Sequence, residues 1–424
     1  MVWIMTKVAQ KIKGYRCTLC GKEFAYDGKD RLTCPDCGEK GILDIVFDYA
    51  SIKKRLTREK LSANPNFTMW RYHELLPVDG EDFHDFLRDG GSPLYRCKRL
   101  GALWGSDALY VKDDGINPTA SLKDRASGVA VARARELGYH TIACSSTGNA
   151  ASSMAGNAAR LGLRAVIFVP ERAPQGKLSQ MLCFGAKVIS VRGDYKATFD
   201  LSRAAIDRYG WYNRNAGINP LMIEGKKTVA LEIAEQFNFK APDWVACSVG
   251  DGCTIGGVYN GFRDLVELGL LDRVPKILGV QSTGCCPFVD AAEAGRDLKP
   301  AAENTLADSI SVGVPRNPVK ALRAVRESGG SWLAVPDEAI LKAIKTLASR
   351  EGLFAEPAAA AAAAGAEKAL REDLIHAHES LVIINSGSGL KDSKNALRAG
   401  GQPLSADPDP EKLDGLDLGR AGEQ

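Results

Sequence analysis

From about residue 92, short apolar runs alternate with segments of helical periodicity, and no other feature of the sequence constrains the fold as strongly. The helical segments, such as 125–137 and 150–161, end at or near a glycine. Alternation of this kind is typical of parallel sheets covered by helices on both faces. The expected strands are residues 108–112, 141–145, 164–170, 187–192, 244–249, 277–281 and 381–385.

The chain has 424 residues, which is more than a single domain usually holds. We therefore expect an α/β protein with two doubly wound parallel-sheet domains and a ligand between them. The predicted units are a small N-terminal unit at 1–48, a large domain at 49–135 and 240–400, a small α/β domain at 136–239, and a tail at 401–424. The tail is polar and rich in proline, so we expect it to be disordered.

Two C-x-x-C pairs lie near the N-terminus, at Cys17 and Cys20 and at Cys34 and Cys37. Each pair can turn two thiolates toward one ion, and two pairs complete a tetrahedral zinc site of the ribbon type. A segment this short buries too little apolar surface to fold without such a cross-link. A redox dithiol and four unrelated thiols are the alternatives. The other seven of the eleven cysteines are scattered, which predicts reduced thiols.

Composition excludes several classes of protein. Hydrophobic residues make up 45% and charged residues 25%, which is average for soluble globular proteins. A formal net charge of +3 is too weak to indicate nucleic acid or an anionic membrane as the main partner. The chain has no apolar run of about 18 residues, and its first residues lack the pattern of a secretion signal. We therefore expect a cytoplasmic protein with a small-molecule ligand and no membrane partner.

Lys123 lies in the first turn of a predicted helix, after an extended Asn-Pro-Thr segment. The positive end of a helix disfavours an ammonium ion, so this amine is nearer the neutral state that a nucleophile needs. We expect Ser121 to cap the helix, and Asp124 and Arg125 to pair locally at its start. An ordinary surface lysine is the alternative.

Three further stretches follow predicted strands. Residues 145–149 (Ser-Ser-Thr-Gly-Asn) and 250–254 (Gly-Asp-Gly-Cys-Thr) each lie between a strand and a helix, where backbone N–H groups can bind an anion. The second loop lacks the Rossmann spacing and the Lys-Ser or Lys-Thr pair of a nucleotide P-loop. Residues 386–389 (Ser-Gly-Ser-Gly) follow the apolar strand at 381–385. Helix caps and ordinary turns are the alternatives.

In this order the four stretches resemble those of threonine synthases, within the fold type II group of pyridoxal phosphate (PLP) enzymes, over roughly residues 92–395. The resemblance implies that Lys123 binds PLP covalently and transfers the α-proton of an amino acid. The other implied contacts are Asn149 with the cofactor's 3′-oxygen, Ser386 with its ring nitrogen, Gly250, Asp251, Gly252, Cys253 and Thr254 with its phosphate, and Ser146 and Thr147 with the substrate's α-carboxylate.

The likeness extends to residues 218–228, which are similar to the threonine synthase stretch Asn-Pro…Glu-Gly-Gln-Lys-Thr. Threonine synthases commonly place hydroxyls and an arginine around the substrate phosphate, whereas this chain has Ala150, Gly217 and Met222. A phosphate dianion needs paired donors, so other groups must replace them if the substrate carries a phosphate. The cations that could do so are Lys226, Lys227, Lys177 and Arg316.

The resemblance implies a PLP-dependent carbon–oxygen lyase of amino-acid biosynthesis, which converts O-phosphohomoserine to threonine by elimination and water addition and acts as a homodimer. A neutral hydroxyl at Ser386 suits elimination and replacement better than transamination. The alternatives are the same scaffold acting as a cysteate synthase on O-phosphoserine or as a serine/threonine dehydratase. A non-catalytic zinc-ribbon module is a remote alternative, because the acids and bases of the ribbon form no basic face. We interpret Glu356-Pro357-Ala358 as the structural start of a closely packed helix.

Overall fold

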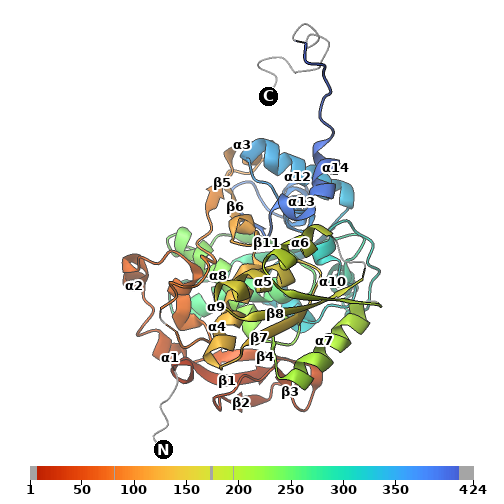
Figure 1. The fold of residues 1–424 in the computed structure, drawn as a ribbon. Coiled ribbons are helices and arrows are strands. Elements are labelled where there is room, and N and C mark those ends of the chain that lie inside the picture. Colours follow the sequence, from red (N-terminus) through yellow and green to blue (C-terminus); the bar gives the residue numbers. More distant parts are fainter. Residues whose placement is uncertain (1–6, 81, 172–174, 194, 410–424) are drawn as a thin grey trace, which may run out of the picture.

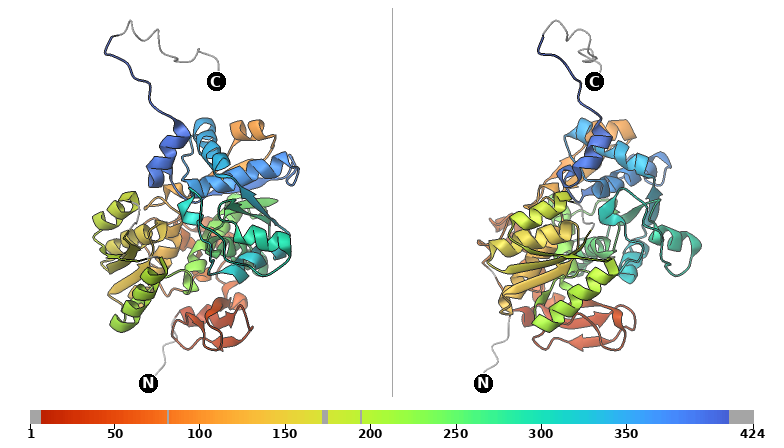
Figure 2. Two further views of the ribbon diagram at one scale, coloured as in Figure 1. Left: turned by 90° about the vertical axis from the view of Figure 1, so that its right-hand side faces the viewer. Right: turned by 45° about the vertical axis from the view of Figure 1, so that its right-hand side comes forward.

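The computed structural model describes residues 7–80, 82–171, 175–193 and 195–409, which form three sheets surrounded by helices (Figure 1). Residues 410–424, most of the tail that we expect to be disordered, lie outside the described residues. Figure 2 shows the smaller parallel sheet and its helices beside the larger one, with the N-terminal sheet below both. The expected α/β class, with two parallel sheets and a small N-terminal unit, is confirmed.

The larger sheet has six strands in the order β13-β12-β11-β14-β6-β5, and all are parallel except β5. Because β11, β14 and β6 are parallel neighbours, the loops that follow them leave the same edge of the sheet. Ligands of open parallel sheets bind at that edge. The strands are β5 (Leu94–Arg96), β6 (Leu109–Asp113), β11 (Trp244–Ser248), β12 (Lys276–Ser282), β13 (Ser331–Val335) and β14 (Leu381–Asn385).

The smaller sheet is parallel throughout, with the strand order β10-β7-β8-β9. Its strands are β7 (Thr141–Ser145), β8 (Arg164–Pro170), β9 (Lys187–Val191) and β10 (Tyr212–Asn213). All seven predicted strands are therefore present, three of them with the predicted bounds. Sequence analysis missed β5, β10 and β13 because the first two are very short and the third is a partly exposed edge strand.

Helices cover both parallel sheets. The α-helices are α1 (Tyr49–Ile52), α2 (Arg58–Ala63), α3 (Lys98–Trp104), α4 (Lys123–Glu136), α5 (Asn149–Arg160), α6 (Gln175–Cys183), α7 (Tyr195–Tyr209), α8 (Leu221–Gln236), α9 (Cys253–Glu267), α10 (Pro287–Ala294), α11 (Pro318–Glu327), α12 (Asp337–Glu351), α13 (Pro357–Arg371) and α14 (Ser393–Gly400). The 3-10 helices are η1 (Val8–Gln10), η2 (Met69–Leu75), η3 (Asp114–Ile116), η4 (Asp308–Ile310) and η5 (Gly389–Asp392). Within the described ranges, none of the helices has the length and apolarity that a membrane crossing requires.

Alternate residues of the central strands face two different helical layers. Ala246 and Ile383 belong to the apolar cluster that includes α13, whereas Val245 and Val382 belong to the cluster that includes α4, α8 and α9. The alanine run 358–364 of α13 is entirely buried, and the helix contacts β11, β12 and β14. Small side chains allow this close approach, so the closely packed helix is confirmed. Burial on both faces explains why the strands read as continuous apolar runs.

The N-terminal sheet is antiparallel, in the order β2-β1-β4-β3, with strands β1 (Ile12–Cys17), β2 (Glu23–Ala25), β3 (Thr33–Cys34) and β4 (Gly38–Phe47). It packs directly on the helices of the larger unit. Asp30 forms an ion pair with the buried Arg133 of α4 at 3.0 Å. Lys320 of α11 donates a 2.6 Å hydrogen bond to the Leu43 carbonyl and pairs with Asp44 at 3.1 Å. The N-terminal unit therefore shares its interior with the helices beneath the large sheet.

Candidate functional site

Lys123 is the first residue of α4, which follows β6 and the short helix η3. The helix has no side-chain cap, and the Ser121 hydroxyl finds no partner among the described residues, so the predicted Ser121 cap is wrong. The Asp124 carboxylate instead accepts hydrogen bonds from the Thr119 N–H at 2.8 Å and the Thr119 hydroxyl at 2.6 Å. This contact holds the preceding loop against the first turn of α4.

Arg125 does not pair locally, contrary to prediction. It forms a buried network with Asp114 at 2.6 Å and Glu232 at 2.6 Å. Glu232 also binds Lys112 of β6 at 2.7 Å. Four buried charges therefore lock α4 and α8 to the strand that precedes Lys123. The contributing residues are distant in sequence, so local spacing could not reveal the network.

Burial lowers the pKa of the Lys123 amine, and the nearby cation of Arg214 lowers it further, while the Glu356 carboxylate raises it. A depressed pKa is what a nucleophilic lysine requires. The expected direction of the shift is confirmed, but desolvation rather than the helix terminus is its main cause. Arg214 was missed in the sequence because it stands among polar residues without a motif.

Ser386 lies directly beside this lysine. It follows β14, and its carbonyl accepts a 3.0 Å hydrogen bond from the N–H of Leu122. The Ser388 N–H donates to the Ala120 carbonyl at 3.1 Å, so the two segments run antiparallel past each other. The last of the four stretches predicted for the site therefore contacts the first.

Asn149 is the first residue of α5, the helix that follows β7 of the smaller sheet. Its side chain extends to the larger unit. The Asn149 Nδ2 donates a 2.7 Å hydrogen bond to Oε1 of Glu356, whose own N–H donates to the Gly387 carbonyl at 2.9 Å. Among the described residues, the amide oxygen of Asn149 has no partner. Both side chains are buried. Glu356 was predicted to be only structural, and its contacts now make it part of this site.

The loop 250–254 presents a series of unused backbone donors. Within the described ranges, none of the five N–H groups from Gly250 to Thr254 donates a hydrogen bond. Gly252 has φ +85, and a Cβ there would lie 2.7 Å from the Asn317 carbonyl oxygen, so only glycine fits. The Asp251 carboxylate accepts a 2.8 Å hydrogen bond from the N–H of Arg316, so this carboxylate faces the neighbouring loop. Consecutive free amides at a helix start suit a phosphate.

The loop after β7 also has backbone N–H groups without a partner among the described residues, as the loop 250–254 does. The Ser146 hydroxyl accepts from the Gly148 N–H at 3.2 Å, and Ser146 and Thr147 are only partly buried. In the part of the chain that the structure describes, the N–H groups of Thr147 and Asn149 make no hydrogen bond. These donors and hydroxyls suit a carboxylate. Ser146 and Thr147 remain predicted ligands of the substrate carboxylate.

Two of the three positions that differ from the threonine synthase pattern, Gly217 and Met222, are closely surrounded by other side chains. A Cβ on Gly217 would lie 2.6 Å from Cδ of Arg316, so the stem of the arginine occupies the space that a serine side chain would take. The Arg316 guanidinium stacks over Phe199 at 3.9 Å. Met222 is fully buried in the apolar core.

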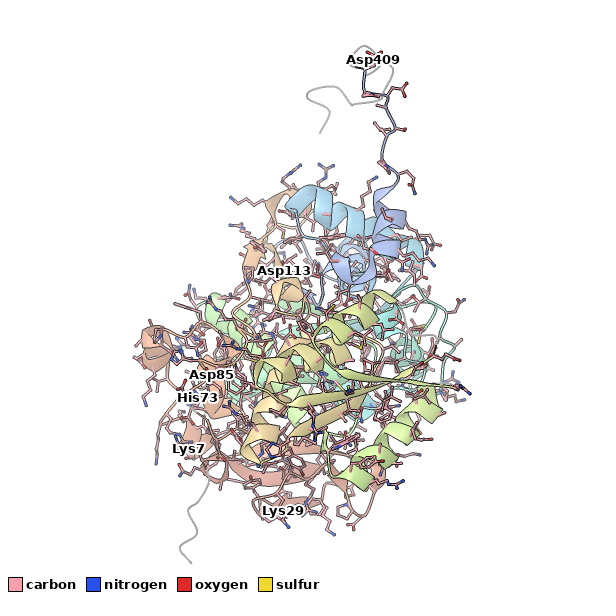
Figure 3. The ribbon with its side chains drawn as sticks, in the orientation of Figure 1. Lys7, Lys29, His73, Asp85, Asp113 and Asp409 are labelled. Atoms are coloured by element: carbon pink, nitrogen blue, oxygen red, sulfur yellow. The ribbon has the colours of Figure 1, made fainter. Side chains whose placement is uncertain are left out.

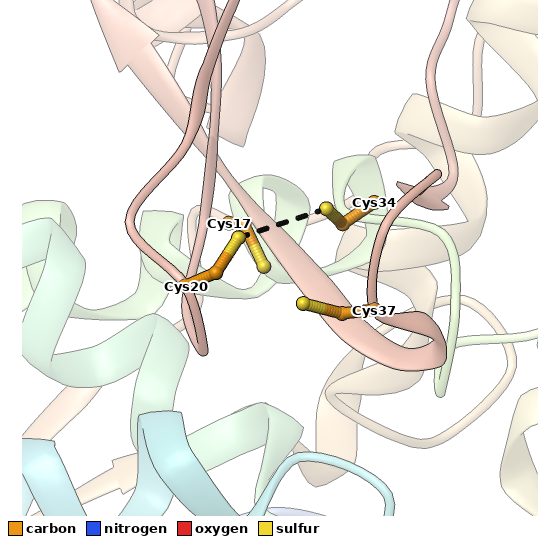
Figure 4. A group of neighbouring side chains, drawn as sticks. All are labelled: Cys17, Cys20, Cys34 and Cys37. Carbon is orange, nitrogen blue, oxygen red and sulfur yellow. Dashed lines mark hydrogen bonds between the residues drawn. The ribbon is translucent and has the colours of Figure 1, made fainter.

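The cluster of Cys17, Cys20, Cys34 and Cys37 lies at one end of the N-terminal sheet (Figure 4). Their sulfur atoms all lie within 4.8 Å of one another, and those of Cys20 and Cys34 are 3.8 Å apart. Four sulfurs at about 2.3 Å from one zinc ion would be about 3.8 Å apart, whereas a disulfide would hold two at about 2 Å. The cluster fits a structural zinc ion.

Two basic side chains on the ribbon surface pair with acidic ones. Lys22 pairs with Asp36 at 2.7 Å, and Arg16 pairs with Glu23 at 2.6 Å. Lys29 lies at the outer rim of the ribbon, away from the parallel sheets (Figure 3). Paired charges of this kind do not suit nucleic acid.

The four stretches together match what PLP requires of a protein. A buried amine with a depressed pKa, a series of free amides and a buried amide oxygen without a partner meet where β6, β11 and β14 end and α5 begins. Each of these groups lacks a protein partner for the atom that the cofactor would contact. The site residues therefore fit the cofactor.

A family model described as pyridoxal-phosphate dependent enzyme matches residues 86–387. The threonine synthase of Methanocaldococcus jannaschii is 41% identical over 397 residues, covering 93% of this chain and 96% of the relative. The threonine synthase of Methanosarcina acetivorans is 40% identical over 409 residues, covering 96% of this chain and 99% of the relative.

Solved structures share the fold at lower identity. The processed form of threonine deaminase isoform 2 from Solanum lycopersicum has a TM-score of 0.65 and 21% identity, covering 89% of this chain and 99% of that chain. Diaminopropionate ammonia lyase from Escherichia coli has a TM-score of 0.64 and 18% identity, covering 80% and 93%. At these identities the likeness concerns the arrangement of the two parallel sheets.

Proposed function

The chain belongs to the threonine synthase family of pyridoxal-phosphate dependent enzymes, and on that premise we propose that it converts O-phosphohomoserine into threonine and phosphate. It is a carbon–oxygen lyase that acts on an amino acid. Identity of about 40% over nearly the whole length of two threonine synthases is the observation that carries the proposal.

We assign the cofactor to the residues that the sequence singled out. Lys123 would hold PLP covalently, the amides of residues 250–254 its phosphate, Asn149 its 3′-oxygen and Ser386 its ring nitrogen. The unpartnered amides of the loop and the unpartnered oxygen of Asn149 support this assignment. Ser146 and Thr147, with the open N–H groups beside them, would hold the substrate's α-carboxylate.

The reaction needs a base that can also return a proton. When bound, PLP withdraws electrons from the substrate's α-carbon, which makes its proton acidic. Lys123 would take this proton, because burial keeps its amine near the neutral form, and would return it later in the cycle. The phosphate leaves from the γ-carbon of the side chain, and water adds at the β-carbon to give threonine.

The test is a substrate panel. Purified protein reconstituted with PLP is incubated with O-phosphohomoserine, O-phosphoserine plus sulfite, serine and threonine, and products are identified by chromatography and mass spectrometry. We expect threonine and phosphate in equal amounts from O-phosphohomoserine. No threonine from that substrate, with product from another member of the panel, would reject the proposal.

One observation favours a second candidate. Ala150, Gly217 and Met222 offer no hydroxyl or cation to a substrate phosphate. This favours a serine/threonine dehydratase, whose substrates carry no phosphate. A cysteate synthase that acts on O-phosphoserine on the same scaffold is the other alternative. Cysteate from O-phosphoserine and sulfite, or a 2-oxo acid from serine or threonine, would identify these activities in the same panel.

The family resemblance also underlies two further proposals: that the protein is a homodimer and that it is cytoplasmic. Light scattering on the purified protein tests the first. Fractionation of cells that express the protein tests the second.

A further inference from the structure

Two buried cations near the candidate site have carboxylate partners. Lys227 of α8 pairs with Asp264 at 2.7 Å and with Glu224. Lys177 pairs with Asp308 at 2.7 Å. Two of the three lysines that the sequence analysis names as possible phosphate ligands therefore already have carboxylate partners. Burying a charge without such a partner is costly.

Lys226, the residue before Lys227, is an exception. Only 2% of its surface is exposed, and among the residues that the structure describes it forms no hydrogen bond or ion pair. Burial lowers the pKa of its amine to about 8, so most of it remains an ammonium ion at neutral pH. Lys123 is likewise buried at its amine and has no ion pair in the described chain. The proposed role of Lys123 supplies it with a cofactor, whereas Lys226 has no assigned partner.

The surroundings of Lys226 indicate what that partner is. A Cβ on Gly257 of α9 would lie 3.1 Å from Cβ of Lys226, so the lysine packs on the first turns of the helix that begins with the 250–254 loop. The charged or ionisable groups that act on it are Cys253 and Asp251 of this loop and the cations Lys123 and Arg214. Lys226 therefore adds a third cation to a region that already presents a row of free amides.

We propose that Lys226 binds a phosphate dianion in the active site. This rests on the proposed function, since two phosphates would then meet there, one on the cofactor and one on the substrate. A charge-assisted hydrogen bond from Lys226 would replace donors that Ala150, Gly217 and Met222 lack. The pairing would also compensate the cost of burying the ammonium.

The experiment compares Lys226→Met, Lys226→Gln and Lys226→Arg with the unchanged protein. The first two variants remove the charge, and the third keeps it. Lys29→Met makes the same substitution at an exposed position of the ribbon and is the matched control. Inorganic phosphate is the probe, and calorimetry measures its affinity for the apoprotein and for the PLP-loaded protein. Absorbance titration gives the affinity for PLP, and thermal denaturation verifies that each variant is folded.

The two sources of phosphate give different results. If Lys226 serves the substrate phosphate, Lys226→Met and Lys226→Gln weaken phosphate binding to the loaded protein by about 10- to 100-fold and raise KM for O-phosphohomoserine similarly. If it serves the cofactor phosphate, they weaken binding of phosphate and PLP to the apoprotein by a similar factor and leave the loaded protein unchanged. Lys226→Arg retains much of the affinity in both cases.

The proposal is overturned if folded Lys226→Met or Lys226→Gln binds phosphate and PLP as the unchanged protein does, or if the unchanged protein binds no phosphate in either form. Failure of the proposed function has a different signature. In that case O-phosphohomoserine is not converted by the unchanged protein, while the calorimetry with inorganic phosphate still decides the role of Lys226.

Discussion

Asn149 and Glu356 are joined by a 2.7 Å hydrogen bond that crosses from the smaller parallel sheet to the larger one. Asn149 starts the helix after β7, and Glu356 immediately precedes the alanine-rich α13. Glu356 acts on Lys123, whose pKa its carboxylate raises. This single contact therefore links the position of Asn149, the proposed ring-oxygen ligand, to the proton affinity of the proposed base.

Replacing Glu356 with glutamine removes the charge and keeps an acceptor for Asn149. The carboxylate raises the pKa of Lys123, so its loss should lower that pKa further and leave more neutral amine at a given pH. In the apoprotein, the pH midpoint of reductive methylation at Lys123, followed by mass spectrometry, should move to lower pH. Glu338→Gln, on the exposed side of α12, is the control. An unchanged or higher midpoint would show that Glu356 does not act on the lysine.

Lys123→Ala should abolish turnover, because the covalent attachment point and the proton carrier are lost together. Borohydride treatment of the unchanged protein should leave a pyridoxyl group on the peptide that contains Lys123. Peptide mapping by mass spectrometry verifies the position. A label on Lys226 or on any other lysine would contradict the assignment.

Ser386→Ala should keep PLP bound and lower turnover about fivefold, the loss of one neutral hydrogen bond of about 1 kcal/mol. Ser386→Asp should lower turnover further and yield products of transamination, because a carboxylate favours a protonated ring nitrogen and stronger electron withdrawal. Steady-state kinetics and product analysis distinguish the two variants. Full activity in both would mean that Ser386 merely ends β14.

Cys34→Ser should remove zinc, of which we expect about one ion per chain, and lower the midpoint of thermal unfolding by about 5 °C or more. The ribbon shares its core with α4 and α11, so the whole chain should unfold earlier and not the ribbon alone. Cys183→Ser, at an exposed thiol outside the cluster, should change neither quantity. The hypothesis fails if metal analysis of protein purified without chelator detects no zinc.

Much of the fold could be predicted because it depends on local pattern. Strands buried on both faces read as apolar runs, so β7, β8 and β14 were located at their true bounds. The two-residue strand β10 carries too little pattern to be seen, and the exposed β5 pairs only at the edge of the sheet. Pairing at a sheet edge depends on tertiary neighbours that the local sequence does not show.

The residues of the candidate site also fall into those that the local sequence could predict and those that it could not. Residues on strand-end loops, such as Asn149 and Ser386, could be found because each stands in a recognisable stretch. Glu356 and Arg214 could not, since they reach the site from segments whose sequence reads as ordinary helix start or loop. The ion network of Arg125 was also missed, because its partner Glu232 is 107 positions away.

The stem of Arg316 stands where a side chain on Gly217 would have to go. The two positions are therefore coupled in any attempt to redesign substrate choice. Introducing serine at 217 alone would displace the Arg316 side chain. It would also disturb the loop around Arg316, whose backbone N–H is hydrogen-bonded to the Asp251 carboxylate. A smaller residue at 316 has to come first, and only then does the hydroxyl find room. The order of the two substitutions, and not just their identity, therefore decides whether the intermediate protein carries this steric conflict.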